Sequence, residues 1–163
     1  LITMHRPSNV DTKKSLKRLM DEIVNLSEYV QCVLPLHPRT RNRLSSFGIW
    51  KKYKNISNLK IIDPVGYLDF MCLQKNSKVV ITDSGGIQEE SSFFNVPCLT
   101  VRDNTERPVT ITNGTNKLIG TSYTNIVDEF KKIDIDTTKS NINLWDGKAS
   151  QRIVSILKKE IKW

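Results

Sequence analysis

Short apolar runs alternate with longer amphipathic stretches along most of the chain. The runs lie at residues 1–3, 32–36, 59–63, 78–82, 97–101 and 118–120. Apolar runs of three to five residues bounded by turn-forming residues are typical of buried strands. The pattern therefore predicts six short strands in the interior of the protein.

The stretches between these strands have the apolar spacing of helices. Residues 16–26 repeat apolar side chains with helical period, and Asp11 or Thr12 can cap this helix. Pro38 opens a basic helix that Gly48 ends. Further helices are predicted at residues 67–73, 87–94, 126–133 and 153–161, and a polar surface loop at 134–143. Strands that alternate with helices predict an α/β fold, a parallel sheet with helices on both faces.

The bulk composition is that of a globular protein. The 163 residues fit one domain or half of a two-domain enzyme, and 38% hydrophobic residues are enough for a core. The apolar runs are too short to cross a bilayer, so no membrane association is expected. The first residues, L-I-T-M-H-R-P, lack the regions of a signal peptide and resemble a strand. We therefore expect a fragment of a longer protein.

The cysteines predict neither a metal site nor a disulfide framework. Cys32, Cys72 and Cys98 are odd in number, lie far apart and form no C-x-x-C pair. All three are predicted to be small buried apolar residues in a reducing compartment, the cytoplasm.

The net charge of +8 raises the possibility of nucleic-acid binding. However, the basic residues are spread over predicted helix faces, as in K-K-S-L-K-R and L-K-K-E-I-K, with no aromatic-and-basic recognition motif. Solvated helix faces explain the charge better, and no nucleic-acid partner is expected. A nucleic-acid domain, the alternative, would bind DNA or RNA with steep salt dependence and no preference for uridine diphosphate.

Chemically active residues follow each predicted strand. Both histidines of the chain are among them, since His5 follows the first strand and His37 the second. The remaining strand ends carry Asp63, Asp83, Ser84, Arg102, Asp103, Glu106 and Arg107. The carboxyl ends of parallel strands meet at one edge, where ligands of open α/β sheets bind. These residues are therefore expected along a single binding edge.

The segment T-D-S-G-G-I-Q-E-E, residues 82–90, is the most specific of these strand ends. A strand that leads through Ser84, Gly85 and Gly86 into a helix aims free backbone N–H groups at an anion such as phosphate. The glycines permit close approach, and the serine hydroxyl can add a donor. A plain turn that requires glycine is the alternative. Neither a dinucleotide fingerprint nor a Walker loop is present, so no such cofactor is expected.

Charged residues around this turn fit a nucleoside diphosphate. Glu89 and Glu90 lie one turn into the helix, where the helix dipole alone would favour an acid. A carboxylate that points back over the turn could instead accept both hydroxyls of a ribose. Arg6 and Arg107 could neutralise the two phosphates.

Six segments together resemble the C-terminal half of the non-hydrolysing UDP-N-acetylglucosamine 2-epimerases. They are T-M-H-R-P-S-N-V-D, L-P-L-H-P-R-T, I-D-P-V-G-Y-L-D-F, T-D-S-G-G-I-Q-E-E, R-D-N-T-E-R-P and N-G-T-N-K-L-I-G, in the family's order and with similar spacing. The resemblance covers residues 1–132, and the fourth and fifth segments are highly specific.

The resemblance implies a fold of two Rossmann-like domains, as in the GT-B glycosyltransferases. Residues 1–163 would be one Rossmann-like UDP-binding domain, the C-terminal domain, with the N-terminal domain absent. The implied activity is an isomerase that interconverts UDP-GlcNAc and UDP-ManNAc by elimination and re-addition of UDP. It implies no cofactor and no metal, and a homodimer at full length.

The resemblance also implies roles for residues of the binding edge. Ser84, Gly85 and Gly86 would hold the phosphates, and Glu90 the ribose hydroxyls. Phe70, in G-Y-L-D-F, would frame the uracil.

Two further roles concern the sugar end of the substrate and an activator. His5 would contact the diphosphate near the anomeric carbon and assist its departure, and Arg107 would complete the pocket. Some bacterial members bind a second UDP-GlcNAc as an activator, and Arg6 and His37 match positions near that site.

Two departures from the family pattern bear on activity. Many members have H-R-x-E-N where this chain has H-R-P-S-N, with Ser8 in place of the acid, which weakens the case for allosteric activation. The carboxylates that move the C2 proton lie in the family's N-terminal half, so this chain alone is not expected to epimerise. The alternatives are the donor-binding half of a GT-B glycosyltransferase and a hydrolysing 2-epimerase.

Overall fold

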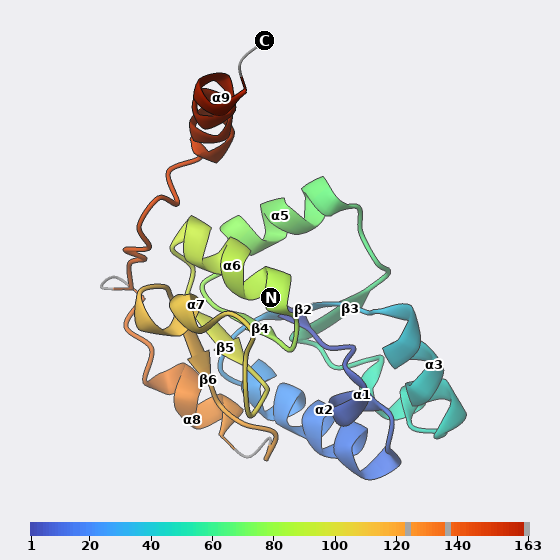
Figure 1. Ribbon diagram of the computed structural model, residues 1–163. Helices are drawn as coiled ribbons and strands as arrows, with labels where there is room; N and C mark the ends of the chain where they lie inside the picture. The colour runs from blue at the N-terminus through green and yellow to red at the C-terminus, as the bar shows by residue number, and fades with distance from the viewer. Residues whose placement is uncertain (123–124, 136–137, 162–163) are drawn as a thin grey trace.

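The computed structural model describes residues 1–122, 125–135 and 138–161 (Figure 1). All of its strand pairs are parallel. β1 (Ile2–Thr3), β4 (Val80–Thr82), β5 (Cys98–Thr100) and β6 (Asn116–Leu118) form one ladder, and β2 (Cys32–Pro35) pairs with β3 (Leu59–Ile62). β1 lies next to β2, so the six strands run in the order β3-β2-β1-β4-β5-β6. This is the strand order of a Rossmann-like doubly wound sheet.

Helices cover both faces of the sheet, as the sequence predicts (Figure 1). α2 (Lys13–Ser27) and α8 (Ile126–Lys131) lie against one face, and α5 (Tyr67–Lys75) and α6 (Gly85–Phe94) lie against the other. α3 (Pro38–Ser46) follows β2 and ends before Gly48, which has a φ of 69°. Thr12 caps α2 by accepting a hydrogen bond from the Ser15 backbone N–H at 3.1 Å.

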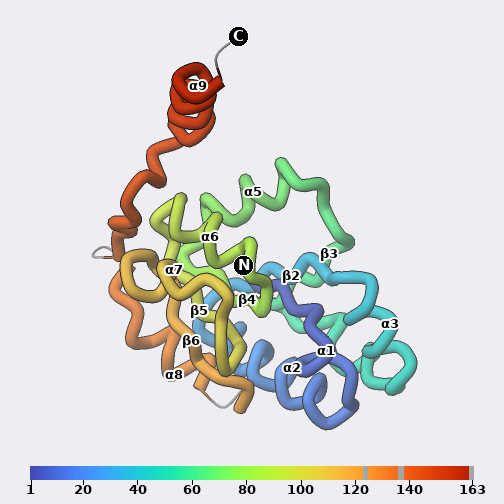
Figure 2. The backbone as a smooth tube through the Cα atoms, viewed as in Figure 1, coloured from blue at the N-terminus to red at the C-terminus, as the bar shows by residue number. Residues whose placement is uncertain are grey.

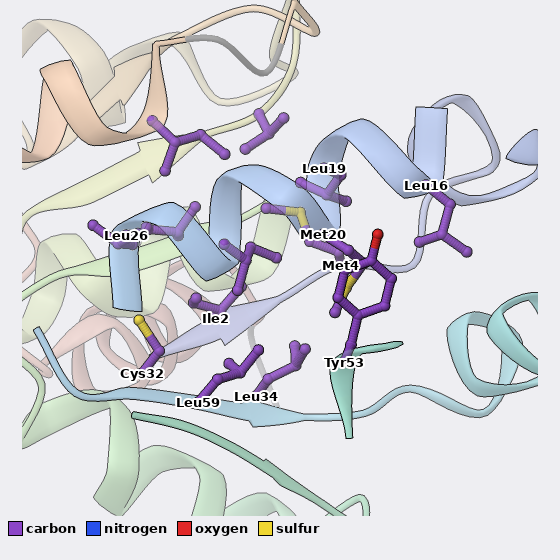
Figure 3. Close-up of a cluster of buried hydrophobic side chains, with 14 of the residues drawn as sticks. Ile2, Met4, Leu16, Leu19, Met20, Leu26, Cys32, Leu34, Tyr53 and Leu59 are labelled. Atoms are coloured by element: carbon purple, nitrogen blue, oxygen red, sulfur yellow. The ribbon is translucent and has the colours of Figure 1, made fainter. Parts of the chain in front are cut away.

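The main core lies between α2 and the sheet. Figure 3 shows α2 side chains facing Cys32, Leu34 and Leu59 of β2 and β3, with Ile2 of β1 in the same layer. A smaller cluster around Val80 and Cys98 packs under α6 on the opposite face. Successive residues of a strand point to opposite faces, so β4 supplies Val80 to one cluster and Ile81 to the other. Burial on both faces explains why the strands are continuous apolar runs.

Several details differ from the sequence prediction. Three short helices were not predicted: α1 (Pro7–Val10), α4 (Trp50–Tyr53) and α7 (Pro108–Thr112). α6 begins two residues earlier than predicted, at Gly85, and β6 lies at 116–118 instead of 118–120. The prediction that all three cysteines are buried is wrong for Cys72, because it lies on the exposed side of α5.

The last helix, α9 (Ala149–Glu160), lies apart from the sheet and its helices (Figure 2). None of its residues is buried. The predicted loop at 134–143 forms neither helix nor strand where it is described, and residues 136–137 of it lie outside the described residues. Over the described ranges, no helix is long and apolar enough to cross a membrane.

Candidate nucleotide site

The strand order places a topological switch point between β1 and β4. The chain winds outward from β1 to β2 and β3, and then returns to place β4 on the other side of β1. Ligands of open α/β sheets bind at the carboxyl ends of the strands at such a point. The H-R segment after β1 and the D-S-G-G segment after β4 meet there, as the sequence predicts.

Asp83 is the residue that joins these two segments. Its carboxylate is fully buried and accepts hydrogen bonds from three donors. The donors are the backbone N–H groups of His5 and Arg6, at 3.0 and 2.8 Å, and the side-chain amide of Asn9, at 2.9 Å. The Arg6 Nε also donates to the Asp83 carbonyl at 2.9 Å. Asp83 therefore fixes the turn that carries His5 and Arg6.

Both histidines lie at the same edge, beside Asp83. The rings of His5 and His37 have centroids 4.9 Å apart, and the His5 Nδ1 is 3.3 Å from the Asp83 carboxylate. This contact favours a proton on Nδ1 of His5 and leaves its other nitrogen for a ligand. His37 caps α3, because its Nδ1 accepts from the Arg39 backbone N–H at 3.2 Å. Burial lowers the pKa of His37, and the nearby His5 lowers it further.

The glycine-rich turn opens directly into α6. Ser84 is the N-cap residue, and its side chain forms no capping hydrogen bond. The first backbone N–H groups of a helix have no partner within the helix, so those of α6 face the switch point ready to donate. A Cβ placed on Gly86 would meet nothing within 4 Å, and one on Gly85 would come no closer than 3.8 Å to Glu106. The space above both glycines is open to a ligand.

A carboxylate near this turn is neutralised by arginines. Arg102 is almost fully buried and binds Glu106 through two hydrogen bonds, at 2.7 and 2.9 Å. Arg6 approaches the same carboxylate at 3.7 Å. The hydrogen bonds from Arg102 lower the pKa of Glu106 to about 2, so it is ionised at neutral pH. Two guanidinium groups lie against the Glu106 carboxylate, and the buried Asp83 carboxylate also lies beside Arg6.

The other flank of the turn carries two glutamates and Arg107. Arg107 forms an ion pair with Glu89 at 2.9 Å, which holds its guanidinium beside the first turns of α6. Glu90 accepts a long hydrogen bond from the Tyr67 hydroxyl at 3.5 Å, so it faces the start of α5. The pKa of Glu90 is raised overall. Burial raises it most, the nearby Glu89 raises it further, and the Tyr67 hydrogen bond offsets part of this increase.

Phe70 lies one turn further along α5 and is half-buried. α5 is tied to α6 by Gln74, whose amide donates to the Ile87 carbonyl at 3.1 Å and to the Ser91 hydroxyl at 2.9 Å. The fold thus brings His5, His37, Arg6 and the S-G-G turn together at the switch point. Phe70 stays on the neighbouring helix, α5.

Sequence reasoning placed Asp83, Arg102 and Glu106 along the binding edge without partners, and Tyr67 only as a neighbour of Phe70 in G-Y-L-D-F. The position of Asp83 directly after an apolar strand did not predict its burial, because Asp63 follows β3 in the same way and is exposed. The Arg102–Glu106 pair had the i, i+4 spacing of an ion pair, but it lies in a loop where that spacing has no fixed meaning. Tyr67 reaches Glu90 only because α5 packs against α6.

Fold and site together define a Rossmann-like domain with a glycine-rich turn, the uncapped start of α6, at its switch point. The UDP-N-acetylglucosamine 2-epimerase family profile matches residues 1–158. A relative of that name from Methanocaldococcus jannaschii is 42% identical over 96% of this chain. A UDP-2,3-diacetamido-2,3-dideoxy-D-glucuronate 2-epimerase from Pseudomonas aeruginosa is 37% identical over 98% of it. The chain belongs to the UDP-N-acetylglucosamine 2-epimerase family.

Solved structures agree with this assignment. The M. jannaschii UDP-GlcNAc 2-epimerase superposes with a TM-score of 0.87 and 40% identity, over 97% of this chain and 45% of that one. A crystal structure of the same enzyme in complex with UDP-GlcNAc and UDP gives a TM-score of 0.81, over 97% of this chain and 44% of that one. The chain spans about 43% of the M. jannaschii relative's length and 44% of the P. aeruginosa one's.

Proposed function

We propose that the chain is the UDP-binding part of an enzyme that interconverts UDP-GlcNAc and UDP-ManNAc. The uncapped, glycine-rich start of α6 at the switch point carries the proposal, because it offers backbone donors to a diphosphate. Family membership supports it, as does the crystallisation of a relative with UDP-GlcNAc and UDP. In this proposal residues 1–163 form one domain, and the full-length enzyme is a cytoplasmic homodimer that needs no cofactor.

The proposed reaction eliminates UDP from the sugar and adds it back after C2 is inverted. Negative charge develops on the departing diphosphate, and the N–H groups of Gly85 and Gly86 are aimed where that charge appears. Arg107 adds a cation on one flank and Arg6 on the other. His5, oriented by Asp83, contacts the diphosphate near the anomeric carbon and assists its departure when both of its ring nitrogens carry protons. The C2 proton transfer requires carboxylates outside this chain, so the isolated chain is expected to be inactive.

A second sugar is a candidate substrate, because a relative that matches a similar share of this chain is named for a different sugar. The P. aeruginosa relative is a 2-epimerase of UDP-2,3-diacetamido-2,3-dideoxy-D-glucuronate. Both sugars are carried by UDP, so the nucleotide site of this chain serves either. Product analysis of the full-length enzyme separates these epimerases from a glycosyltransferase or a hydrolysing enzyme. The products would be a UDP-linked epimer, a transferred sugar, or a free sugar plus UDP.

UDP is expected to bind the chain more tightly than CDP. Hydrogen bonds from a ribose diol to a carboxylate contribute about 1.5–3 kcal/mol, so Glu90→Gln is expected to weaken UDP binding roughly tenfold or more. Isothermal titration calorimetry with both nucleotides measures this. Glu28→Gln, an exposed acid at the end of α2, is the matched control and should leave the affinity unchanged. Equal binding of UDP and CDP, or no loss in Glu90→Gln, would contradict the proposal.

A further inference from the structure

A cavity lies beside the H-R segment and does not include the glycine turn of the nucleotide site. It has a volume of about 480 Å³ and is formed by the H-R segment, the start of α2 and the loops after β5 and β6. Arg6 and Arg102, which also face Glu106, line it together with Lys14 and Arg18 of α2. None of His37, Gly85, Glu90 or Arg107 lines it.

The charge of this cavity is only partly compensated. Four basic side chains line it, namely those of Arg6, Lys14, Arg18 and Arg102, and one carboxylate, that of Asp103. Arg102 and Arg6 face Glu106. Asp103 accepts from the backbone N–H and the hydroxyl of Thr121, at 3.1 and 3.0 Å. In the described part of the chain, neither Lys14 nor Arg18 forms an ion pair.

Local electrostatics make this arrangement unfavourable without a ligand. α2 begins K-K-S-L-K-R and has no acid in its first turn, which places cations at the positive end of the helix dipole. Lys14 and Arg18 are four residues apart, so their like charges repel on one helix face. Lys17, on the same helix, is paired with Asp21 at 2.8 Å. Local rules broken at one point of a regular element are expected where function requires it.

The geometry also holds one of these cations, Arg18, in place. Arg18 donates from Nη2 to the Ser122 carbonyl at 3.0 Å, which ties its guanidinium to the loop after β6. Ser8 and Ser15 also line the cavity, and the Ser15 hydroxyl, which accepts from Thr12 at 2.9 Å, can donate to an oxygen of an anion. A hollow lined mostly by charges of one sign concentrates ions of the opposite sign.

We propose that this cavity binds a phosphate or diphosphate group, in a site separate from the nucleotide site. Lys14 and Arg18 supply the charge, and the Ser15 hydroxyl supplies a further hydrogen bond. The proposal does not rest on the chain binding UDP. The ligand is either an inorganic anion or the phosphate end of an organic metabolite, since both present the same oxygens.

Titration with sodium diphosphate at about 0.15 M salt, followed by ¹H–¹⁵N NMR, tests the proposal. The amides of Lys14, Ser15 and Thr121 report on the cavity, and those of Gly85 and Gly86 report on the nucleotide site. We expect saturable shifts at the cavity amides. Lys14→Glu should weaken this binding by at least about tenfold, because it replaces an attraction with a repulsion.

Lys13→Glu is the matched control, because Lys13 is exposed on the same turn and does not line the cavity. It should change the affinity by less than about twofold, since Lys13 does not line the cavity and salt screens its charge from a ligand bound there. Ser8→Glu, which puts a carboxylate into the cavity, should also abolish the cavity shifts. Equal losses in Lys13→Glu and Lys14→Glu, or diphosphate shifts at Gly85 and Gly86 alone, would overturn the proposal.

Two further titrations distinguish an organic phosphate from an inorganic ion, and the cavity site from the nucleotide site. Tighter binding of glucose 6-phosphate than of inorganic phosphate at the cavity amides would indicate an organic phosphate, and equal binding an inorganic ion. In parallel, UDP is titrated into Lys14→Glu, in which the cavity is blocked. Diphosphate shifts at the cavity of the wild-type chain, without UDP shifts at Gly85 and Gly86 of the variant, would support the cavity site and contradict the nucleotide site. UDP shifts at Gly85 and Gly86 without diphosphate shifts at the cavity would support the nucleotide site and contradict the cavity site.

Discussion

Asp83→Ala is expected to lower the free energy of unfolding by about 3–5 kcal/mol, the range seen when one partner of a buried charged network is removed. The substitution leaves the N–H groups of His5 and Arg6 without the carboxylate that accepts from them, around a fully buried position. The Asn9 amide also loses this acceptor, although it keeps its hydrogen bond to the Val101 carbonyl. Each buried donor left unsatisfied costs about 1–3 kcal/mol. Urea denaturation followed by circular dichroism measures the loss.

The chain offers a control for Asp83→Ala in another aspartate at a strand end. Asp63 follows β3 and binds Arg41, but its side chain is 85% exposed. Asp63→Ala should change the free energy of unfolding by less than about 1 kcal/mol, because exposed ion pairs are screened by water and salt. Asp83→Asn should fall between the two, since its amide keeps one acceptor oxygen. Losses of the same size in Asp83→Ala and Asp63→Ala would show that Asp83 does not hold the H-R turn.

Most of the sheet could be predicted from the sequence, because strands buried on both faces are continuous apolar runs. Val80 and Ile81 are apolar neighbours that point to opposite faces, and each packs in a different cluster. β6 was misplaced because its buried residue Asn116 is polar. The Asn116 amide binds Gln88 and Thr110 at 3.1 Å, so hydrogen bonds replace the apolar signal on which the prediction depended.

The short helices were missed because they are too short to show a helical period of apolar residues. α1 and α4 have four residues each and α7 has five, fewer than the two turns over which an apolar period can be recognised. Cys72 was predicted to be buried from its residue type alone. The face of a helix that is covered depends on tertiary packing, and that packing leaves Cys72 on the open side of α5.

The site was predictable to the level of the backbone and no further. Parallel strands bring their carboxyl ends to one edge, so His5, His37 and the S-G-G turn could be placed together from strand order alone. Side-chain partners could not, because they depend on rotamers and loop conformation. Arg107 is held by Glu89, and Arg6 lies between Asp83 and Glu106. Neither arrangement follows from residue spacing.

Gly86→Ala is expected to separate stability from binding at the anion turn. A methyl group on Gly86 meets no protein atom within 4 Å, so the fold can accept it. The free energy of unfolding should stay the same or rise by up to about 1 kcal/mol, because alanine restricts the unfolded chain and favours helix. A diphosphate that accepts the Gly86 N–H would contact this methyl group, so UDP binding should weaken by at least about tenfold, or 1.4 kcal/mol.

The ligand itself supplies the control for Gly86→Ala. Uridine has the base and ribose of UDP but no phosphates, so its affinity should be the same in the wild-type chain and the variant. Gly85→Ala is expected to behave similarly, although its methyl group would also lie near Glu106. Calorimetry with UDP and uridine, together with urea denaturation, measures both properties in one set of samples. If Gly86→Ala is stable and binds UDP with unchanged affinity, the diphosphate does not lie against the start of α6. A diphosphate bound there would contact the added methyl group and bind more weakly.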